Sequence, residues 1–255
     1  MGPTERFTEI VQRAEPEVAL DEVALLIAAH DHDVDVSAQM ARLDELAIGA
    51  PPSPDALSTY LFVERGFVGN SVDYSDPRNS FLDTVLDRRL GLPIALSVLM
   101  IEVGRRAGLD LVGIGMPGHF LVGADHGVFF DPFHGGERLD AHGCRERFAT
   151  TQGDAPFLPE YLAPVGAHAI VARMLANLVR SYVARDPASA VWAARLRLRV
   201  PGGSPSDRRE AAALLGTLGR FEEAAAELAA IAAELDGPAA SRVERDAAAY
   251  RARAN

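Results

Sequence analysis

His119 and Asp131 are the residues whose types and spacing point most directly to chemistry. Each lies at the border of a predicted strand, and a turn separates them, so adjacent antiparallel strands would bring the imidazole and the carboxylate within hydrogen-bonding distance. In a nucleophile–His–Asp site, the acid fixes the tautomer and the orientation of the ring. A structural histidine beside a turn aspartate would give the same pattern, and the two residues alone do not separate these interpretations.

The composition excludes several other kinds of chemistry. Among 255 residues there is one cysteine, Cys144, and all 25 basic residues are arginine. One cysteine excludes an internal disulfide, a CxxC-type zinc site and a cysteine-ligated iron–sulfur cluster. The lack of lysine excludes Schiff-base chemistry and a P-loop lysine. This lysine-free, Ala- and Arg-rich usage is typical of GC-rich bacterial genomes.

The charge and the apolar segments bear on partners and location. The formal net charge is −11 and there is no basic block, so we expect no nucleic-acid partner and no membrane partner. The N-terminus has no apolar h-region, and the longest apolar run, residues 92–101, is shorter than the roughly 20 residues that span a bilayer. We therefore expect a cytoplasmic protein.

The first of three predicted regions, residues 1–68, reads as helical. Apolar residues recur at helical spacing in three segments, which are 18–29, 40–48 and 57–63. The polar run His30-Asp31-His32-Asp33 between the first two is interpreted as a solvated helix end, since polar clusters between periodic segments are usually loops.

The second region, residues 69–164, is predicted to be an α+β core. Pro93 suits the first position of a helix, and the residues after it are apolar on nearly every side, which indicates a buried helix ending near Gly108. Three strand candidates with glycine-rich separators follow, at residues 111–116, 119–123 and 127–131. We expect a central helix packed against a small antiparallel sheet.

The third region, residues 165–255, is predicted to contain a helical repeat. An offset of 34 aligns the helix 169–185 with 203–219, and it aligns the turn at 186–190 with the turn at 220–224. Thirty-four residues is the period of the tetratricopeptide repeat (TPR), although a generic Ala-rich hairpin would also fit. Two repeats cannot bury both faces of a solenoid, so we expect this region to pack on the rest of the protein or on a partner.

Short motifs in a fixed order carry a family resemblance. The chain closely resembles the SirB-type transglutaminase-like family in GFVGN at 66–70, DPRNS at 76–80, Arg89, GLP at 91–93, PGHFLV at 117–122 and DPFHGG at 131–136. The resemblance covers nearly the whole chain and implies a helical N-terminal region, a papain- or transglutaminase-like core and C-terminal TPR-like hairpins. Enzymes of this kind place a catalytic Cys at the start of the central helix, followed by the His and the Asp that His119 and Asp131 match.

The nucleophile position departs from that pattern. It falls at or beside Pro93, which lacks both a thiol and the backbone N–H that would help to hold an oxyanion. Removing the nucleophile of a triad lowers kcat about a millionfold. Ser97 would point into the core, Ser80 is equally a helix cap, and Cys144 follows the aspartate in the chain, where Arg145 and Arg147 would lower its pKa.

We therefore predict a catalytically degenerate protein that acts as a protein-interaction or regulatory module and is not an enzyme. A groove around His119, Asp131 and the loop residues Asp76, Arg78, Asn79 and Ser80 would bind a peptide or small ligand, and a protein partner would bind the C-terminal repeats.

The competing hypothesis is a hydrolase or amidase that uses His119 and Asp131 with Ser80, Cys144 or a metal-bound water. Its metal version would combine that pair with His134, with or without His126 or His142 as a further ligand. Because His126 and His142 are expected at a hairpin tip and in a loop, we expect no metal and no cofactor.

Overall fold

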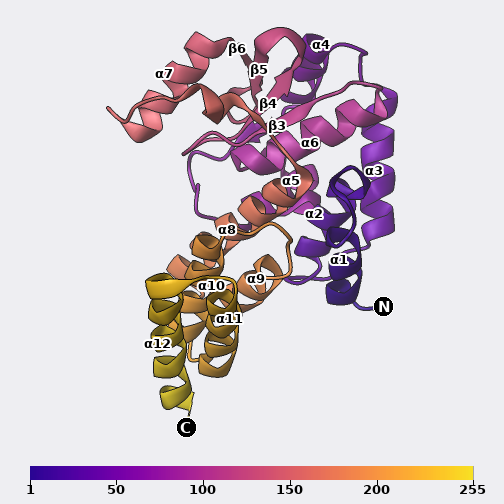
Figure 1. Ribbon diagram of the computed structural model, residues 1–255. Coiled ribbons are helices and arrows are strands. Elements are labelled where there is room, and N and C mark those ends of the chain that lie inside the picture. The colour runs from indigo at the N-terminus through magenta and orange to yellow at the C-terminus, as the bar shows by residue number, and fades with distance from the viewer. Residues whose placement is uncertain (255) are drawn as a thin grey trace. The chain divides into compact units, whose positions relative to one another are not determined.

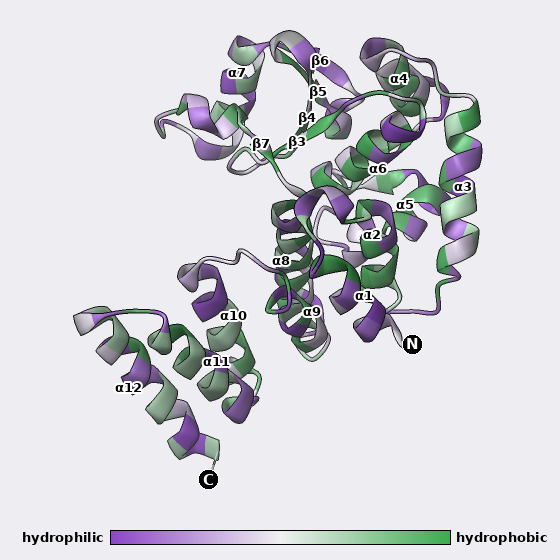
Figure 2. Cartoon of the chain, turned by 45° about the vertical axis from the view of Figure 1, so that its right-hand side comes forward, coloured by the Kyte–Doolittle hydropathy of each residue, from purple (hydrophilic) through white to green (hydrophobic). Residues whose placement is uncertain are grey.

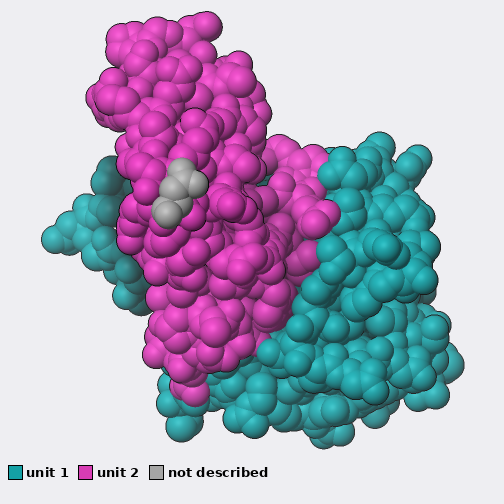
Figure 3. Space-filling view, turned by 90° about the horizontal axis from the view of Figure 1, so that it is seen from below, with its two compact units in different colours: residues 1–174 teal, residues 175–255 magenta. Residues whose placement is uncertain are grey.

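A computed structural model describes residues 1–254, apart from the side chain of His126 (Figure 1). The chain forms two compact units, residues 1–174 and residues 175–255, which Figure 3 distinguishes by colour. The first unit contains the helical N-terminal segment and the α+β core together, and the second contains helices only.

The N-terminal segment is helical, as predicted. Its elements are α1 (Pro3–Val11), η1 (Glu15–Glu17), α2 (Leu20–Ala28), α3 (Val36–Ile48), α4 (Pro54–Thr59) and η2 (Tyr60–Glu64). Two of these helices begin at side-chain caps, because Asp35 accepts a hydrogen bond from the Ala38 amide and Ser53 from the Ala56 amide. In Figure 2 hydrophobic and hydrophilic bands alternate along α3, as expected for a helix with one buried face.

The polar run after α2 is a turn whose histidines bind other parts of the unit. His30 Nε2 lies 2.9 Å from Thr4 Oγ1, and His32 Nε2 lies 2.6 Å from Asp83 Oδ2. The predicted helix end is therefore correct in position, but its side chains are not simply solvated.

The central helix α6 (Pro93–Arg106) begins where the sequence predicts. Pro93 occupies its first turn, where the missing N–H costs no hydrogen bond, and Leu92 is its N-cap. Nearly all of the helix is buried, including Ser97. It is preceded by η3 (Pro77–Ser80), α5 (Leu82–Arg88) and a two-stranded parallel pair, β1 (Val68–Gly69) and β2 (Leu90–Gly91).

The main sheet is antiparallel with the order β6-β5-β4-β3-β7. Three of its strands, β3 (Val112–Ile114), β4 (Leu121–Ala124) and β5 (Val128–Asp131), lie within or beside the predicted segments. The other two strands of this sheet, β6 (Glu137–Leu139) and β7 (Pro164–Val165), were not predicted. The mixed helical and antiparallel architecture is confirmed.

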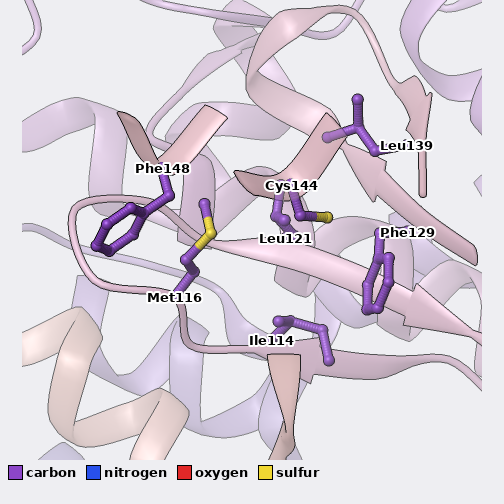
Figure 4. Close-up of a cluster of buried hydrophobic side chains, with 7 residues drawn as sticks. All are labelled: Ile114, Met116, Leu121, Phe129, Leu139, Cys144 and Phe148. Atoms are coloured by element: carbon purple, nitrogen blue, oxygen red, sulfur yellow. The ribbon is translucent and has the colours of Figure 1, made fainter. Parts of the chain in front are cut away.

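Two helices pack against different strands of this sheet. Helix α6 packs against β3 and β4, and α7 (Ala141–Gln152) packs against β5 and β6. The strand register places four apolar residues on the side of the sheet that faces α7, namely Ile114, Leu121, Phe129 and Leu139. They form one buried cluster with Met116, Cys144 and Phe148 (Figure 4). After α7 the chain passes through η6 (Pro159–Leu162) to β7.

The C-terminal helices form hairpins. They are α8 (Ala167–Arg185), α9 (Ala190–Arg197), α10 (Pro205–Thr217), α11 (Phe221–Ala233) and α12 (Gly237–Ala254). Helix α11 packs on both α10 and α12. A Cβ atom at Gly216 would lie 2.2 Å from the ring of Tyr250, so only glycine allows this approach of α10 to α12. Among residues 1–254, no helix combines the length and the apolar character that a membrane crossing requires.

A buried ion cluster connects α2 and α6. Asp21 accepts hydrogen bonds from Arg105 and Arg106, at 3.2 and 2.7 Å, and Glu102 accepts from the same two arginines. Arg106 also binds Asp44 of α3 at 2.7 Å. Burial, together with the nearby charge of Asp21, raises the pKa of Glu102 to about 7.

We expect Glu102→Gln to change how stability depends on pH. The pKa of Glu102 is higher in the folded state than in the unfolded state. The stabilisation that comes from protonating Glu102 is therefore fully present below the unfolded pKa and is lost as the pH rises through about 7. The free energy of unfolding of the wild type, relative to the variant, should therefore fall between pH 5 and pH 8 by on the order of 1–3 kcal/mol, since a pKa difference of one corresponds to about 1.4 kcal/mol. Urea unfolding at each pH measures this, and parallel curves would contradict it.

Candidate active site

The carboxylate of Asp131 is the centre of the candidate site. It is completely buried at the end of β5. Its Oδ1 lies 2.9 Å from His119 Nε2, and its Oδ2 lies 2.8 Å from His134 Nδ1. Arg147 of α7 places Nε 2.9 Å from the same Oδ2. The two residues that the sequence singled out are therefore in direct contact, and two further side chains share the carboxylate.

The strand pairing explains why His119 reaches Asp131. Strands β4 and β5 pair antiparallel, with Val122 opposite Phe130, so the segment just before β4, which contains His119, and the last residue of β5 lie at the same end of the sheet. Arg173 donates to the carbonyl oxygens of Met116 and His119, at 2.8 and 2.7 Å, which fixes the loop before β4. The loop thus holds the imidazole in place.

Gly118 is a position in this loop where only glycine fits. Its φ is 75°, and a Cβ atom there would lie 2.6 Å from Thr151 Oγ1 and 2.4 Å from Gln152 Nε2 of α7. The loop can therefore approach α7 closely only with glycine before the histidine.

The electrostatics of Asp131 favour its charged form. Burial by itself would raise the pKa of this carboxyl, but the hydrogen bond and charge of His119 and the charge of His134 outweigh burial and hold the pKa below its ordinary value. Arg147 is an ion-pair neighbour of Asp131, although its Nε makes no hydrogen bond there. Its terminal nitrogen binds Glu137 at 2.6 Å.

Pro93, which the family resemblance puts at or beside the nucleophile position, begins a helix that packs against both β4 and η5 (Pro132–His134). Asp131 occupies Nε2 of His119, so only Nδ1 of that ring is left to act as a base. Ser97, one turn further along α6, is buried and its Oγ has no hydrogen-bond partner. It lies within the core, as the sequence predicts.

Cys144 does not have the character of a reactive thiol. Its side chain is buried in the hydrophobic cluster beneath α7 (Figure 4). Burial, with smaller effects from Asp140 and Asp131, raises its pKa to about 12. The charge of Arg147 lowers this pKa, as its place in the sequence suggests, but the loss of solvation outweighs that effect and the net pKa is raised.

Most polar side chains of the loop that was predicted to bind a ligand make their contacts within the loop or with its immediate neighbours. Asn79 donates to the Asp73 carbonyl at 2.7 Å and accepts from Asn70 at 3.0 Å. Asp76 is buried and pairs with Arg78 and Arg88, while Ser80 is buried with no hydrogen-bond partner for its Oγ.

These contacts leave the loop residues unequally open to a ligand. Asn79 and Ser80 are not presented to a ligand because their side chains are enclosed, and Asp76 is committed to the neighbouring arginines. Arg78 is the exception, since most of its side chain is exposed.

The metal candidates are only partly brought together. His119, Asp131 and His134 each offer a ligand atom, and these atoms all lie within 4.8 Å of one another. His142 is exposed on α7, where it faces Glu146 at 3.5 Å. The side chain of His126 lies outside the described part of the chain.

Sequence reasoning missed the role of Arg147, and it named His134 only as a metal candidate. Arg147 lies on a helix after β6, so no local spacing relates it to Asp131. His134 did have a signal, because Asp131 caps the short helix η5 and accepts from the His134 amide at 3.3 Å, which places that ring over the carboxylate.

The site and fold define the class of protein. Residues 10–176 match the family model described as the transglutaminase-like superfamily. The chain therefore belongs to the transglutaminase-like superfamily. It is similar in sequence to a UPF0162 protein over 75% of its length.

The relatives extend from bacteria to animals. A UPF0162 protein of Xylella fastidiosa is 46% identical over 138 residues, which are 51% of this chain and 49% of that protein. One from Pseudomonas aeruginosa is 32% identical over 206 residues, or 75% of this chain and 74% of that protein. Human F-box only protein 21 is 32% identical over 101 residues, 35% of this chain and 16% of that protein.

The chain spans about half the length of the Xylella relatives that it matches. No solved structure gives a significant match.

Replacing Asp131 by alanine should destabilise the protein strongly. The change leaves Arg147 and two imidazoles without their common partner, and breaking a buried pair typically costs about 3–5 kcal/mol. The matched control is Asp55→Ala, which breaks the exposed Arg138–Asp55 pair and should cost at most about 1 kcal/mol. Urea unfolding at neutral pH measures both, and equal losses would show that the Asp131 cluster contributes no special stability.

Proposed function

We propose that this protein is a catalytically degenerate transglutaminase-like protein of the SirB type that acts by binding other proteins. The observation that carries the proposal is Pro93 at the head of α6, in the place of the nucleophile. Its partner is a protein or peptide that contacts the core surface near His134 and the C-terminal helical hairpins. We place this activity in the cytoplasm.

The chemistry at the head of α6 supports the loss of catalysis. Proline has neither a thiol nor an N–H, so position 93 supplies neither the attacking atom nor an oxyanion donor. Losing one such donor costs about a hundredfold to a thousandfold in kcat, in addition to the loss of the nucleophile itself. Ser80 and Cys144 do not compensate, because both are buried and the pKa of the thiol is raised to about 12.

The bonding of Asp131 also supports a structural use of the remnant pair. A triad carboxylate serves one imidazole, whereas this one is shared by His119, His134 and Arg147. Sharing the charge among several donors weakens the support that any one imidazole receives when it takes up a proton. The pair is therefore better suited to holding the surrounding segments together than to accepting a proton in catalysis.

An exposed apolar surface beside the remnant provides a place for a partner. Three residues in β1 and in the loop between β1 and η3 are solvent-exposed although apolar or aromatic, with exposed fractions of 43% for Val68, 98% for Val72 and 50% for Tyr74. Tyr74 packs edge-on against Phe133 at 5.7 Å, next to His134, whose side chain is 41% exposed. We call Val68, Val72, Tyr74 and His134 the rim surface.

The rim surface is fixed to the remnant site by close packing. A Cβ atom at Gly69 would lie 2.4 Å from the Phe133 ring and 2.5 Å from its carbonyl oxygen. Phe133 in turn lies edge-on to His119 at 6.2 Å. Exposed apolar side chains gathered next to a rigid site are typical of protein-binding surfaces, which supports a partner with apolar or aromatic side chains.

The C-terminal hairpins support the same kind of function. An offset of 34 residues carries α8 onto the segment that contains α10, and α9 onto the segment that contains α11. The buried small residues at the crossings, Ala224 and Gly216, allow the close helix approach that such repeats need. We therefore propose that these helices are TPR-like and bind protein.

Introducing a thiol at position 93 tests whether the nucleophile site is otherwise intact. In Pro93→Cys, we expect a thiol whose pKa lies below the ordinary value of about 8.5, because His119 can stabilise the thiolate. The pKa should rise by about one or more when His119→Ala is added. The rate of alkylation by iodoacetamide as a function of pH measures both values.

The wild type is the control, since its single thiol at Cys144 should react only after unfolding. An unperturbed thiol pKa in Pro93→Cys that His119→Ala leaves unchanged would show that position 93 is not the nucleophile's place. Labelling of the wild type by a hydroxyl-reactive probe that disappears in His119→Ala would establish a working enzyme and overturn the proposal.

Photo-crosslinking tests the rim surface. A photoreactive amino acid at Val72 should give one discrete crosslinked protein in cells that produce this protein, and Tyr74→Ala should reduce that product several-fold. The matched control is the same probe at Ile48, which is 87% exposed on α3 and lies outside the rim surface. The same products from both positions, or a product unaffected by Tyr74→Ala, would contradict a binding role for this surface.

A further inference from the structure

We propose that His119, Asp131 and His134 form a binding site for one zinc ion. Nothing in the proposed binding role requires this site, so the two proposals fail independently. The three side chains come from the loop before β4, the end of β5 and η5, and their ligand atoms all lie within 4.8 Å of one another. Two imidazoles and one carboxylate with a further position open make up a common zinc ligand set.

The distances need little change to admit an ion. Zinc–nitrogen and zinc–oxygen bonds of about 2.0–2.1 Å in a tetrahedral arrangement separate ligand atoms by roughly 3.3 Å. The contacts from Asp131 to His119 and His134 are 2.9 and 2.8 Å, about half an ångström shorter than that separation, and no two ligand atoms lie more than 4.8 Å apart, so the widest pair has to close by at most about 1.5 Å. His134 can supply most of this shift because it is the exposed member of the three.

The protonation of the rings also allows coordination. His119 would bind through Nε2 and His134 through Nδ1, the atoms that face Asp131. Coordination displaces the proton that each of these nitrogens shares with Asp131 and leaves one proton on the opposite ring nitrogen, so each ring binds the ion as a neutral imidazole. The hydrogen bonds to Asp131 are replaced by bonds to the ion.

Arg147 is the unfavourable neighbour, and its own contacts reduce the cost. It lies 2.9 Å from Asp131 Oδ2 but makes no hydrogen bond there through Nε. Its terminal nitrogen binds Glu137 at 2.6 Å, so it keeps a carboxylate partner when Asp131 turns to an ion. Counting Asp131, Glu137 and Arg147 with neutral rings, the surroundings carry a net charge of about −1 before a cation binds.

The ligand set decides which metal is expected. Imidazole nitrogen favours zinc and its neighbours among the transition metals, whereas Mg²⁺ and Ca²⁺ prefer oxygen ligands throughout. Three protein ligands leave at least one position for a water molecule or for a carboxylate of a bound partner.

Calorimetric titration of the EDTA-treated full chain with ZnCl₂ tests the proposal. We expect one ion per chain, binding at least tenfold more weakly in His134→Gln and unchanged in His142→Gln. The second variant removes an exposed histidine that lies on α7 and faces Glu146. Equal thermal melting of both variants and the wild type in EDTA would show that the loss concerns the ion and not the fold.

Cobalt substitution supplies a second readout. Co²⁺ in a four-coordinate His₂Asp site should give intense visible absorption bands in the wild type and in His142→Gln, and these should be lost in His134→Gln. Absence of zinc uptake, or the same zinc affinity in His134→Gln as in the wild type, would overturn the site. Zinc-binding that MgCl₂ at equal concentration abolishes would also overturn it, since that marks a non-selective oxygen site.

Discussion

The structure around the remnant site depends on one buried charge, the carboxylate of Asp131. A carboxylate without solvent is costly unless it is paired and hydrogen-bonded. Here the partners come from three separate segments, with His119 before β4, His134 in η5 and Arg147 in α7. Satisfying this charge therefore fixes the end of the sheet, the short helix and α7 against one another.

A second buried ion cluster has the same effect on the other side of the core. Asp21 of α2 is paired with Arg105 and Arg106 of α6, which joins the N-terminal helices to the central helix. The first compact unit accordingly runs through residues 1–174, without a division near residue 68. The predicted three regions describe the order of elements along the chain, whereas contacts between elements far apart in sequence, these ion pairs among them, decide which elements share a unit.

The local parts of the fold could be predicted from the sequence, and the long-range parts could not. Apolar periodicity and a proline suited to the first helical turn located α6, and turn spacing placed His119 beside Asp131. Strands β6 and β7 were not predicted, because each has at most three residues and shows no alternation of apolar and polar residues.

Side-chain roles that depend on burial were also beyond the sequence. Arginines next to Cys144 suggested a lowered thiol pKa, but the hydrophobic cluster that encloses the sulfur raises it. Asn79 and Ser80 were predicted to bind a ligand, yet they are enclosed in their own loop. Neighbours in sequence indicate charge, while solvation depends on elements that pack from elsewhere in the chain.

This difference bears on how an enzyme-like pair is to be interpreted. Pro93 fits the first turn of α6 without loss of any helix hydrogen bond, so a residue without an N–H is tolerated there at little cost to the fold. Asp131 has less freedom, because its removal would leave His119 and the Nε of Arg147 without their carboxylate partner. A buried His–Asp pair can thus be retained for structural reasons, whether or not it takes part in catalysis. Of the three side chains that share Asp131, His134 is the most exposed, so its ring and the rim surface beside it are the groups that a partner can reach.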